Sequence, residues 1–308
     1  MKVFILYILL LCSISGFTQD DNFIAQDLSI NTHVDGTLLT PTAIEHPVLA
    51  IIIADSGPTD RNGNQNFQKN NALKKLAEEL SKQNIATFRY DKRIVKQIQK
   101  GNVNSNISFD DFISDAHAVI DYFKSQDSYK KIVVIGHGQG SLVGMVASKD
   151  KADQFISLAG SGKSIDNVII DQITQMDPAL VNDTKRSFEL LKQGKTVKDY
   201  PQPLRGIFSP DLQAFMRSWM AYDPEDVITD LDIPVLIING TKDLQVPVSE
   251  AELLESKSSN AELKLIDNMN HVLFIIEGKD LENSKSYNES FRSISNELIT
   301  EIVQFIKE

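Results

Sequence analysis

The sequence is poor in cysteine and has no excess of positive charge. Its 308 residues contain one cysteine, 31 lysine and arginine residues and 42 aspartate and glutamate residues, for a formal net charge of −11. A single cysteine cannot form a disulfide within the chain, so a disulfide-stapled scaffold is excluded. The acidic balance argues against a nucleic-acid partner, because phosphate binding needs clustered lysine and arginine. Hydrophobic residues make up 42% of the chain, which is enough for a large folded core.

Long apolar runs are also lacking, apart from one near the N-terminus. The run VFILYILLL is too short to span a bilayer and leads into small and polar residues, an order typical of a secretory signal peptide. We expect residues 1–18 to be this signal peptide, with cleavage before Gln19, and the mature protein to be exported to the periplasm or the extracellular space with no membrane partner. A lipoprotein interpretation of Cys12 is weaker, because Leu11 precedes it where a small residue is expected.

Strand-like and helix-like segments alternate along most of the chain. The run VLAIIIA is continuous, rich in branched residues and followed by turn residues, as is typical of a strand buried on both faces. Amphipathic patterns such as residues 109–124 and about 288–307 predict helices between or after such strands. This alternation predicts the α/β class with a mainly parallel, doubly wound sheet. Near the N-terminus, Asp35-Gly36 within an alternating stretch indicates a hairpin turn.

Residues 161–230 interrupt the alternation. They contain no good strand, and their helix-like segments are separated by prolines and glycines. A helical insertion between two strands is the expected form of a lid over the strand ends, where ligands bind in open α/β sheets. Helices that only pad the fold are the alternative. The sequence therefore predicts a core of residues 19–160 and 231–308 and a helical lid of residues 161–230.

The segment KKIVVIGHGQGSLVGMVAS combines a buried strand, a glycine-rich turn and a helix. A dinucleotide-binding turn would need glycine where Ser141 stands, and a phosphate-binding P-loop would need a lysine between Gly140 and Ser141. Glycines that only allow close packing of helix on strand are a third interpretation. The turn resembles the nucleophile elbow of the α/β-hydrolase family, G-x-S-x-G, but Gly138 stands at the position of the serine nucleophile.

Two later strand ends complete the order of residues that this family uses. Asp243 follows the run IPVLIING, and His271 follows the run LKLIDNMN. Taken singly, an aspartate in a turn or a histidine beside apolar residues is usually structural. Because they come in the order nucleophile position, acid, base, we predict that Asp243 is the catalytic acid and His271 the base.

The stretches SGPTDR and RYDKR resemble those of secreted, esterase-like serine hydrolases within this family. The resemblance extends over nearly all of the chain that follows the signal peptide. It implies that backbone N–H groups of Ser56, Gly57 and Gln139 form the oxyanion hole, which holds the negative charge of the reaction intermediate. Asp55 stands where this type of loop often has glycine.

Other polar residues near these motifs are expected to be structural. Arg61, Asp91 and Arg93 are predicted to pair with one another and hold their loops, with binding of an acidic substrate group as the alternative. His137, beside the elbow, is predicted to serve packing and orientation. No group of histidine, cysteine and aspartate has the sequence spacing of a zinc site, so no metal and no other cofactor is expected.

The missing serine decides the functional expectation. In the family the serine oxygen attacks an acyl carbonyl while histidine transfers the proton, and removing the nucleophile lowers the rate about 10⁶-fold. Glycine supplies no nucleophile, and Ser141 is expected to cap its own helix instead of facing His271. The chain is then a natural non-catalytic member, an inactivated form of an active esterase, or a catalyst of a water-based reaction that uses His271 directly.

The resemblance implies an α/β-hydrolase whose parent activity is hydrolysis of a carboxylic ester. A small-molecule acyl ester is the expected substrate or ligand. Two alternatives stay open, namely a non-catalytic binding protein that keeps the acyl pocket and a serine peptidase-like hydrolase, because the same fold also cleaves amides.

Overall fold

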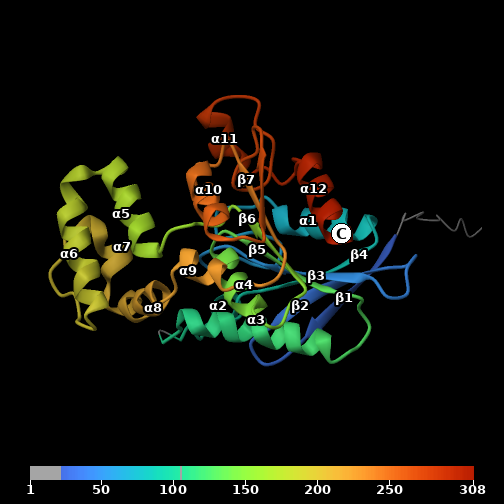
Figure 1. Cartoon of the computed structure of the whole chain (residues 1–308). Helices are drawn as coiled ribbons and strands as arrows, with labels where there is room; N and C mark the ends of the chain where they lie inside the picture. Colours follow the sequence, from blue (N-terminus) through green and yellow to red (C-terminus); the bar gives the residue numbers. More distant parts are fainter. Residues whose placement is uncertain (1–21, 105) are drawn as a thin grey trace, which may run out of the picture.

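An eight-stranded sheet forms the centre of the structure, a computed structural model that describes residues 22–104 and 106–308 (Figure 1). The strand order is β1-β2-β4-β3-β5-β6-β7-β8, and all neighbouring pairs from β4 to β8 are parallel. The mainly parallel sheet predicted from the sequence is therefore confirmed, while the expected signal peptide lies outside the described residues. The strands are β1 (Phe23–Ser29), β2 (Asp35–Pro41), β3 (Val48–Ile53), β4 (Ile85–Tyr90), β5 (Ile132–His137), β6 (Gln154–Leu158), β7 (Val235–Gly240) and β8 (Ala261–Ile266).

The hairpin at the N-terminal edge forms, but its turn is not where the sequence placed it. Asp35 and Gly36 belong to β2 and pair with β1. The turn consists of residues 30–34, in which the Asn31 carboxamide oxygen accepts backbone N–H groups at 2.8 and 3.0 Å. Asparagine favours such turns because its side chain replaces a backbone acceptor.

Helices cover both faces of the sheet (Figure 1). Helices α3 (Phe109–Lys124) and α4 (Gln139–Ser148) pack on one face, and α1 (Ala72–Lys82) and α12 (Asn296–Lys307) pack on the other. The central strands carry apolar side chains into both layers, as expected for continuous apolar runs. Helices α2 (Arg93–Gln99), α10 (Val248–Lys257) and α11 (Asp280–Ser286) complete the sheet-bearing part.

The terminal helix is shorter than its apolar pattern predicts. It begins at Asn296, because the hydroxyl of Ser295 accepts the N–H of Leu298 and caps the helix there. Phe291, which the pattern placed on the apolar face, is 80% exposed.

The chain between β6 and β7 is helical, as predicted, and Figure 1 shows α5 to α8 standing to one side of the sheet. These helices have an apolar core of their own, which includes Phe188, Phe208 and Met216. Their service as a lid stays a prediction. No helix in the described parts of the chain combines the length and apolar character that a bilayer crossing needs. The elements are α5 (Ile165–Met176), η1 (Pro178–Leu180), α6 (Val181–Lys192), η2 (Gln202–Leu204), α7 (Arg205–Phe208), α8 (Pro210–Met220) and α9 (Pro224–Thr229).

Candidate active site

Gly138 forms the sharp turn between β5 and α4. Its φ of 54° and ψ of −120° lie in a region that L side chains rarely adopt. A Cβ atom at this position would lie 1.9 Å from Oδ1 of Asp55. No side chain therefore fits at position 138 while Asp55 keeps its place.

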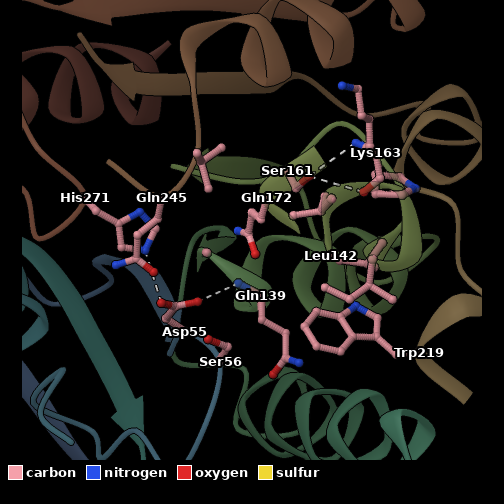
Figure 2. Close-up of a pocket in the computed structure, with 15 residues that line it drawn as sticks. Asp55, Ser56, Gln139, Leu142, Ser161, Lys163, Gln172, Trp219, Gln245 and His271 are labelled. Atoms are coloured by element: carbon pink, nitrogen blue, oxygen red, sulfur yellow. Dashed lines mark hydrogen bonds and ion pairs between the residues drawn. The ribbon is translucent and has the colours of Figure 1, made fainter. Parts of the chain in front are cut away.

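Asp55, in the loop after β3, fills the space in front of Gly138. Figure 2 shows its carboxylate between His271 and Gln139. Its Oδ1 accepts the backbone N–H of Gln139 at 2.8 Å, and its Oδ2 lies 3.1 Å from Nε2 of His271. A carboxylate from one strand end thus occupies the place of the side chain that another strand end lacks. We did not predict these contacts from the sequence; the available signal was a side chain at position 55, where glycine is usual, together with glycine at position 138.

His271 lies between two aspartates. Its Nδ1 is 2.8 Å from Oδ2 of Asp243 and its Nε2 faces Asp55. The structure thus brings together the predicted acid, base and nucleophile position. Burial lowers the pKa of His271, but the charges and hydrogen bonds of Asp243 and Asp55 outweigh burial and raise it to about 10. The imidazole is therefore protonated at neutral pH.

The same contacts keep Asp55 ionised. Burial raises the pKa of Asp55, but the hydrogen bond and charge of His271, helped by the Gln139 N–H, outweigh burial and hold it far below its usual range. A protonated imidazole has no free lone pair, so His271 cannot act as a base in this state.

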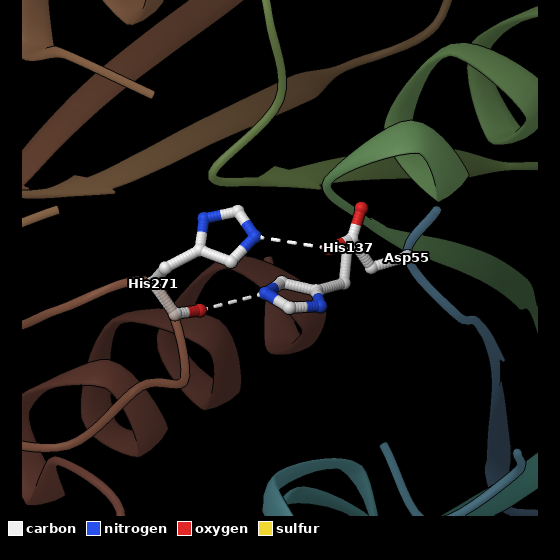
Figure 3. A group of neighbouring side chains, drawn as sticks. All are labelled: Asp55, His137 and His271. Atoms are coloured by element: carbon white, nitrogen blue, oxygen red, sulfur yellow. Dashed lines mark hydrogen bonds and ion pairs between the residues drawn. The ribbon is translucent and has the colours of Figure 1, made fainter. Parts of the chain in front are cut away.

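His137 joins Asp55 and His271 in a compact group of three polar side chains (Figure 3). Their potential ligand atoms lie within 4.8 Å of one another, a proximity that sequence spacing did not reveal because the residues come from three distant segments. Nε2 of His137 lies 2.8 Å from the carbonyl oxygen of His271, to which it donates. Burial and the charge of His271 both lower the pKa of His137, so it is neutral. Hydrogen bonds link the group, and His137 orients the backbone of His271.

The residues predicted to hold an oxyanion differ in their surroundings. The N–H of Gln139 is bonded to Asp55, so it is not free for a substrate oxygen. Ser56 lines the same cavity as Gly138, and Gly57 lines a neighbouring cavity. An oxyanion role for all three stays a prediction.

Lys92 fixes the position of Asp55 and was not singled out in the sequence. Its buried Nζ donates to the backbone carbonyl of Asp55 at 2.9 Å and to Oε1 of Gln139 at 2.6 Å. It also lies 4.5 Å from the ring centre of Phe112. Burial lowers the pKa of Lys92 to about 8, while the charge of Asp55 opposes this shift. The lysine thus ties the β3 loop to the start of α4.

Ser141 faces away from the site. It is fully buried, and its Oγ lies 2.7 Å from Oγ of Ser157 in β6. The expectation that Ser141 caps α4 is wrong, because its side chain is directed at the sheet and not at the free N–H groups of the helix.

Ser141→Ala is expected to lower the free energy of unfolding by about 1–3 kcal/mol, because the buried Ser157 hydroxyl loses its partner. Urea denaturation measures this loss. Fluorophosphonate treatment should label neither the wild type nor the variant. A wild-type adduct that disappears in Ser141→Ala would instead identify Ser141 as a nucleophile.

Arg61 and Arg93 each form ion pairs with aspartates. Arg61 binds Asp91 at 2.7 Å, as predicted. Arg93 does not pair with Asp91; it makes two 2.7 Å hydrogen bonds to Asp115 of α3, because the first turn of α2 lies against that helix. These contacts favour a structural role for both arginines over binding of an acidic substrate group.

Arg93→Ala is expected to cost about 3–5 kcal/mol of stability, because it leaves the carboxylate of Asp115, which is 3% exposed, without its partner. Lys149→Ala is a matched control, since it removes an exposed ion pair with Asp230 and should leave stability nearly unchanged. Chemical denaturation of the two variants checks the contrast. Equal losses of stability in the two variants would contradict the expectation that the buried ion pair contributes more than the exposed one.

Two cavities meet at Asp55 and His271. The surface of one is mostly apolar, with Leu142 and Trp219 of α8 in its wall beside polar side chains such as Gln172 of α5 (Figure 2). The helical insertion therefore supplies part of this wall. The other is lined mainly by polar side chains; they include Thr59, Gln65, Asn70 and Tyr287.

Comparison with known proteins relates the chain to hydrolases. A family model described as serine aminopeptidase, S33, matches residues 68–190, which include Gly138 but not Asp243 or His271. Esterase EstD of Thermotoga maritima is 24% identical over 268 residues; the match covers 85% of this chain and 63% of that esterase. The chain thus spans less than two thirds of the length of this relative.

Solved esterase structures have the same architecture. Est1E from Butyrivibrio proteoclasticus is 18% identical with a TM-score of 0.57, covering 92% of this chain and 99% of that one. Another structure of Est1E, with bound ferulic acid, has a TM-score of 0.58 at 19% identity, covering 92% and 100%. The Pyrococcus furiosus esterase Pf2001 has a TM-score of 0.57 at 15% identity, covering 94% and 92%. The chain has the α/β-hydrolase fold.

Proposed function

We propose that this chain is an exported, esterase-like α/β-hydrolase that has lost the serine step of carboxylic ester hydrolysis. It keeps a pocket for small molecules and the acid–base pair of Asp243 and His271. The observation that carries the proposal is the convergence of this pair and the Gln139 N–H on Gly138, which has no side chain. The similarity to esterases supports ester hydrolysis as the parent activity.

The present state of the site argues against direct hydrolysis of an acyl ester. The oxyanion donor Gln139 is bonded to Asp55, and the base His271 is protonated. An acyl substrate would have to displace Asp55 before its carbonyl oxygen could reach the N–H. We therefore place ester hydrolysis in the ancestry of the chain and not in its present chemistry.

Two alternatives are each supported by one observation. The cavity beside Gly138 supports a non-catalytic protein that captures acyl ligands. The match to serine aminopeptidases supports an amide-cleaving ancestor.

Fluorophosphonate labelling tests the loss of the serine step. The wild type should form no adduct, whereas Asp55→Gly/Gly138→Ser should be labelled at residue 138, because it regains a nucleophile next to His271. Adding His271→Gln to the double variant should abolish labelling. An adduct on the wild type, or a folded double variant that resists labelling, would contradict the proposal.

A further inference from the structure

The carboxylate of Asp55 occupies the position of the missing serine side chain and has the contacts that a nucleophile needs. We propose that Asp55 attacks the alkyl carbon of a small epoxide and forms an aspartyl ester, which water then hydrolyses to a diol. This would be a hydrolytic activity different from ester cleavage by serine. This proposal rests on the proposed loss of the serine.

The position of the Gln139 N–H decides between an acyl and an alkyl substrate. An acyl substrate needs this N–H for its own carbonyl oxygen, but the N–H lies 2.8 Å from Oδ1 of Asp55. Negative charge builds up on Oδ1 when water attacks Cγ of an Asp55 ester and makes that carbon tetrahedral. The N–H therefore stabilises the transition state for hydrolysis of an ester at Asp55 itself.

In the first step, an Oδ2 lone pair forms a bond to an epoxide carbon, and the carbon–oxygen bond of the ring breaks. The ring oxygen leaves with the electron pair and takes the proton from Nε2 of His271, which starts 3.1 Å from Oδ2. Asp55 is then a neutral ester and His271 a neutral imidazole. The largely apolar cavity beside Gly138, with Leu142 and Trp219 in its wall, suits the carbon skeleton of the substrate.

In the second step, His271 accepts a proton from water as the water oxygen attacks Cγ of Asp55. Loss of the Asp55 charge removes one of the two carboxylates that held His271 protonated, so the imidazole becomes a base when hydrolysis needs it. Asp243 still orients the ring through Nδ1. The tetrahedral carbon then expels the diol, which takes a proton from His271, and the Asp55 carboxyl returns its own proton to the imidazole.

The polar cavity offers a separate approach for water. It is lined by Asp55 and His271 and also by the polar side chains of Thr59, Gln65 and Asn70. A cavity with such groups suits water, which satisfies buried polar atoms. The carboxylate therefore has a largely apolar space and a mainly polar space next to it, as an alkyl transfer followed by hydrolysis requires.

The test uses p-nitrostyrene oxide and mass spectrometry of the peptide that contains Asp55. One turnover of the wild type in ¹⁸O-water should place ¹⁸O in the Asp55 carboxylate, because water attacks Cγ and not the substrate. His271→Gln should accumulate an Asp55 adduct with the mass of one epoxide, and Asp55→Asn should form no adduct and lose at least about 10³-fold in diol formation.

Two results would overturn the proposal. One is diol formation with ¹⁸O only in the diol, and the other is absence of both turnover and adduct in the folded wild type. Transfer from 1-bromobutane to Asp55 with no reaction of the epoxide would also overturn the epoxide assignment. The fluorophosphonate labelling of Asp55→Gly/Gly138→Ser does not depend on any of these results, because that variant lacks Asp55. Failure of the epoxide proposal is therefore distinguishable from failure of the proposed function.

Discussion

Asp55→Gly/Gly138→Ser is expected to raise kcat/KM for p-nitrophenyl butyrate at least about 10³-fold above the wild type. The serine regains a base in His271, and the Gln139 N–H becomes free for the substrate oxygen. Loss of a serine nucleophile costs about 10⁶-fold, so 10³-fold is a partial recovery in a site that has not been optimised for it. Hydrolysis is followed by release of p-nitrophenolate at constant pH.

The two single variants are the controls for this recovery. Gly138→Ser should gain little, because its Cβ would lie 1.9 Å from Oδ1 of Asp55. Asp55→Gly should gain nothing, because it supplies no nucleophile. The two changes are thus strongly non-additive in a double-mutant cycle. Gly138→Ser with the full activity of the double variant would show that Asp55 moves aside freely.

Asp55→Asn is expected to lower the pKa of His271 by at least about two units from its value of about 10, because one of the two carboxylates that outweigh burial is removed. Titration of the imidazole signals by NMR measures this shift. Asp243→Asn is the matched variant, since it removes the other carboxylate and should also lower the pKa. An unchanged His271 pKa in Asp55→Asn would show that Asp55 does not help to hold the imidazole protonated.

The raised pKa of His271 also predicts how stability depends on pH. Its folded-state pKa of about 10 exceeds the usual value of 6.5, so the resulting stabilisation is complete below pH 6.5 and is lost as pH rises through 10. Each pKa unit corresponds to about 1.4 kcal/mol, so the contribution of His271 falls by several kcal/mol over this range. Lys92, whose pKa is lowered to about 8, offsets part of this loss above pH 8. Asp55→Asn should lose less, and urea denaturation between pH 6 and pH 10 compares the two. Parallel curves would contradict the prediction.

Strand ends explain which parts of the site were predictable from the sequence. Buried strands that finish in turn residues located Gly138, Asp243 and His271, because parallel strands bring their carboxyl ends to one edge of a sheet. To predict the contacts of Asp55, the register between β3 and β5 is needed as well. Ile53 pairs with Gly136, so positions 55 and 138 each follow their strands by two residues and come face to face.

Local contacts that compete with the sequence pattern explain the wrong predictions for the terminal helix, Ser141 and the hairpin turn. The terminal helix starts late because the Ser295 cap outweighs the apolar periodicity of the preceding segment. Ser141 bonds Ser157, since a fully buried hydroxyl on the sheet side of α4 takes the partner that the sheet offers. The hairpin turn was misplaced because Asn31 competes with Asp35-Gly36 as a turn former. In each case the deciding contact depends on geometry that periodicity does not contain.

The short distance between a Cβ at position 138 and the Asp55 carboxylate limits the order in which single substitutions can convert one form of this site into the other. A serine at 138 and an aspartate at 55 exclude each other, so neither form can acquire the other's residue first without a clash. A route with glycine at both positions avoids the clash, and its intermediate has no nucleophile at either position. Any lineage that connects the two chemistries by this route must pass through a protein that can perform neither.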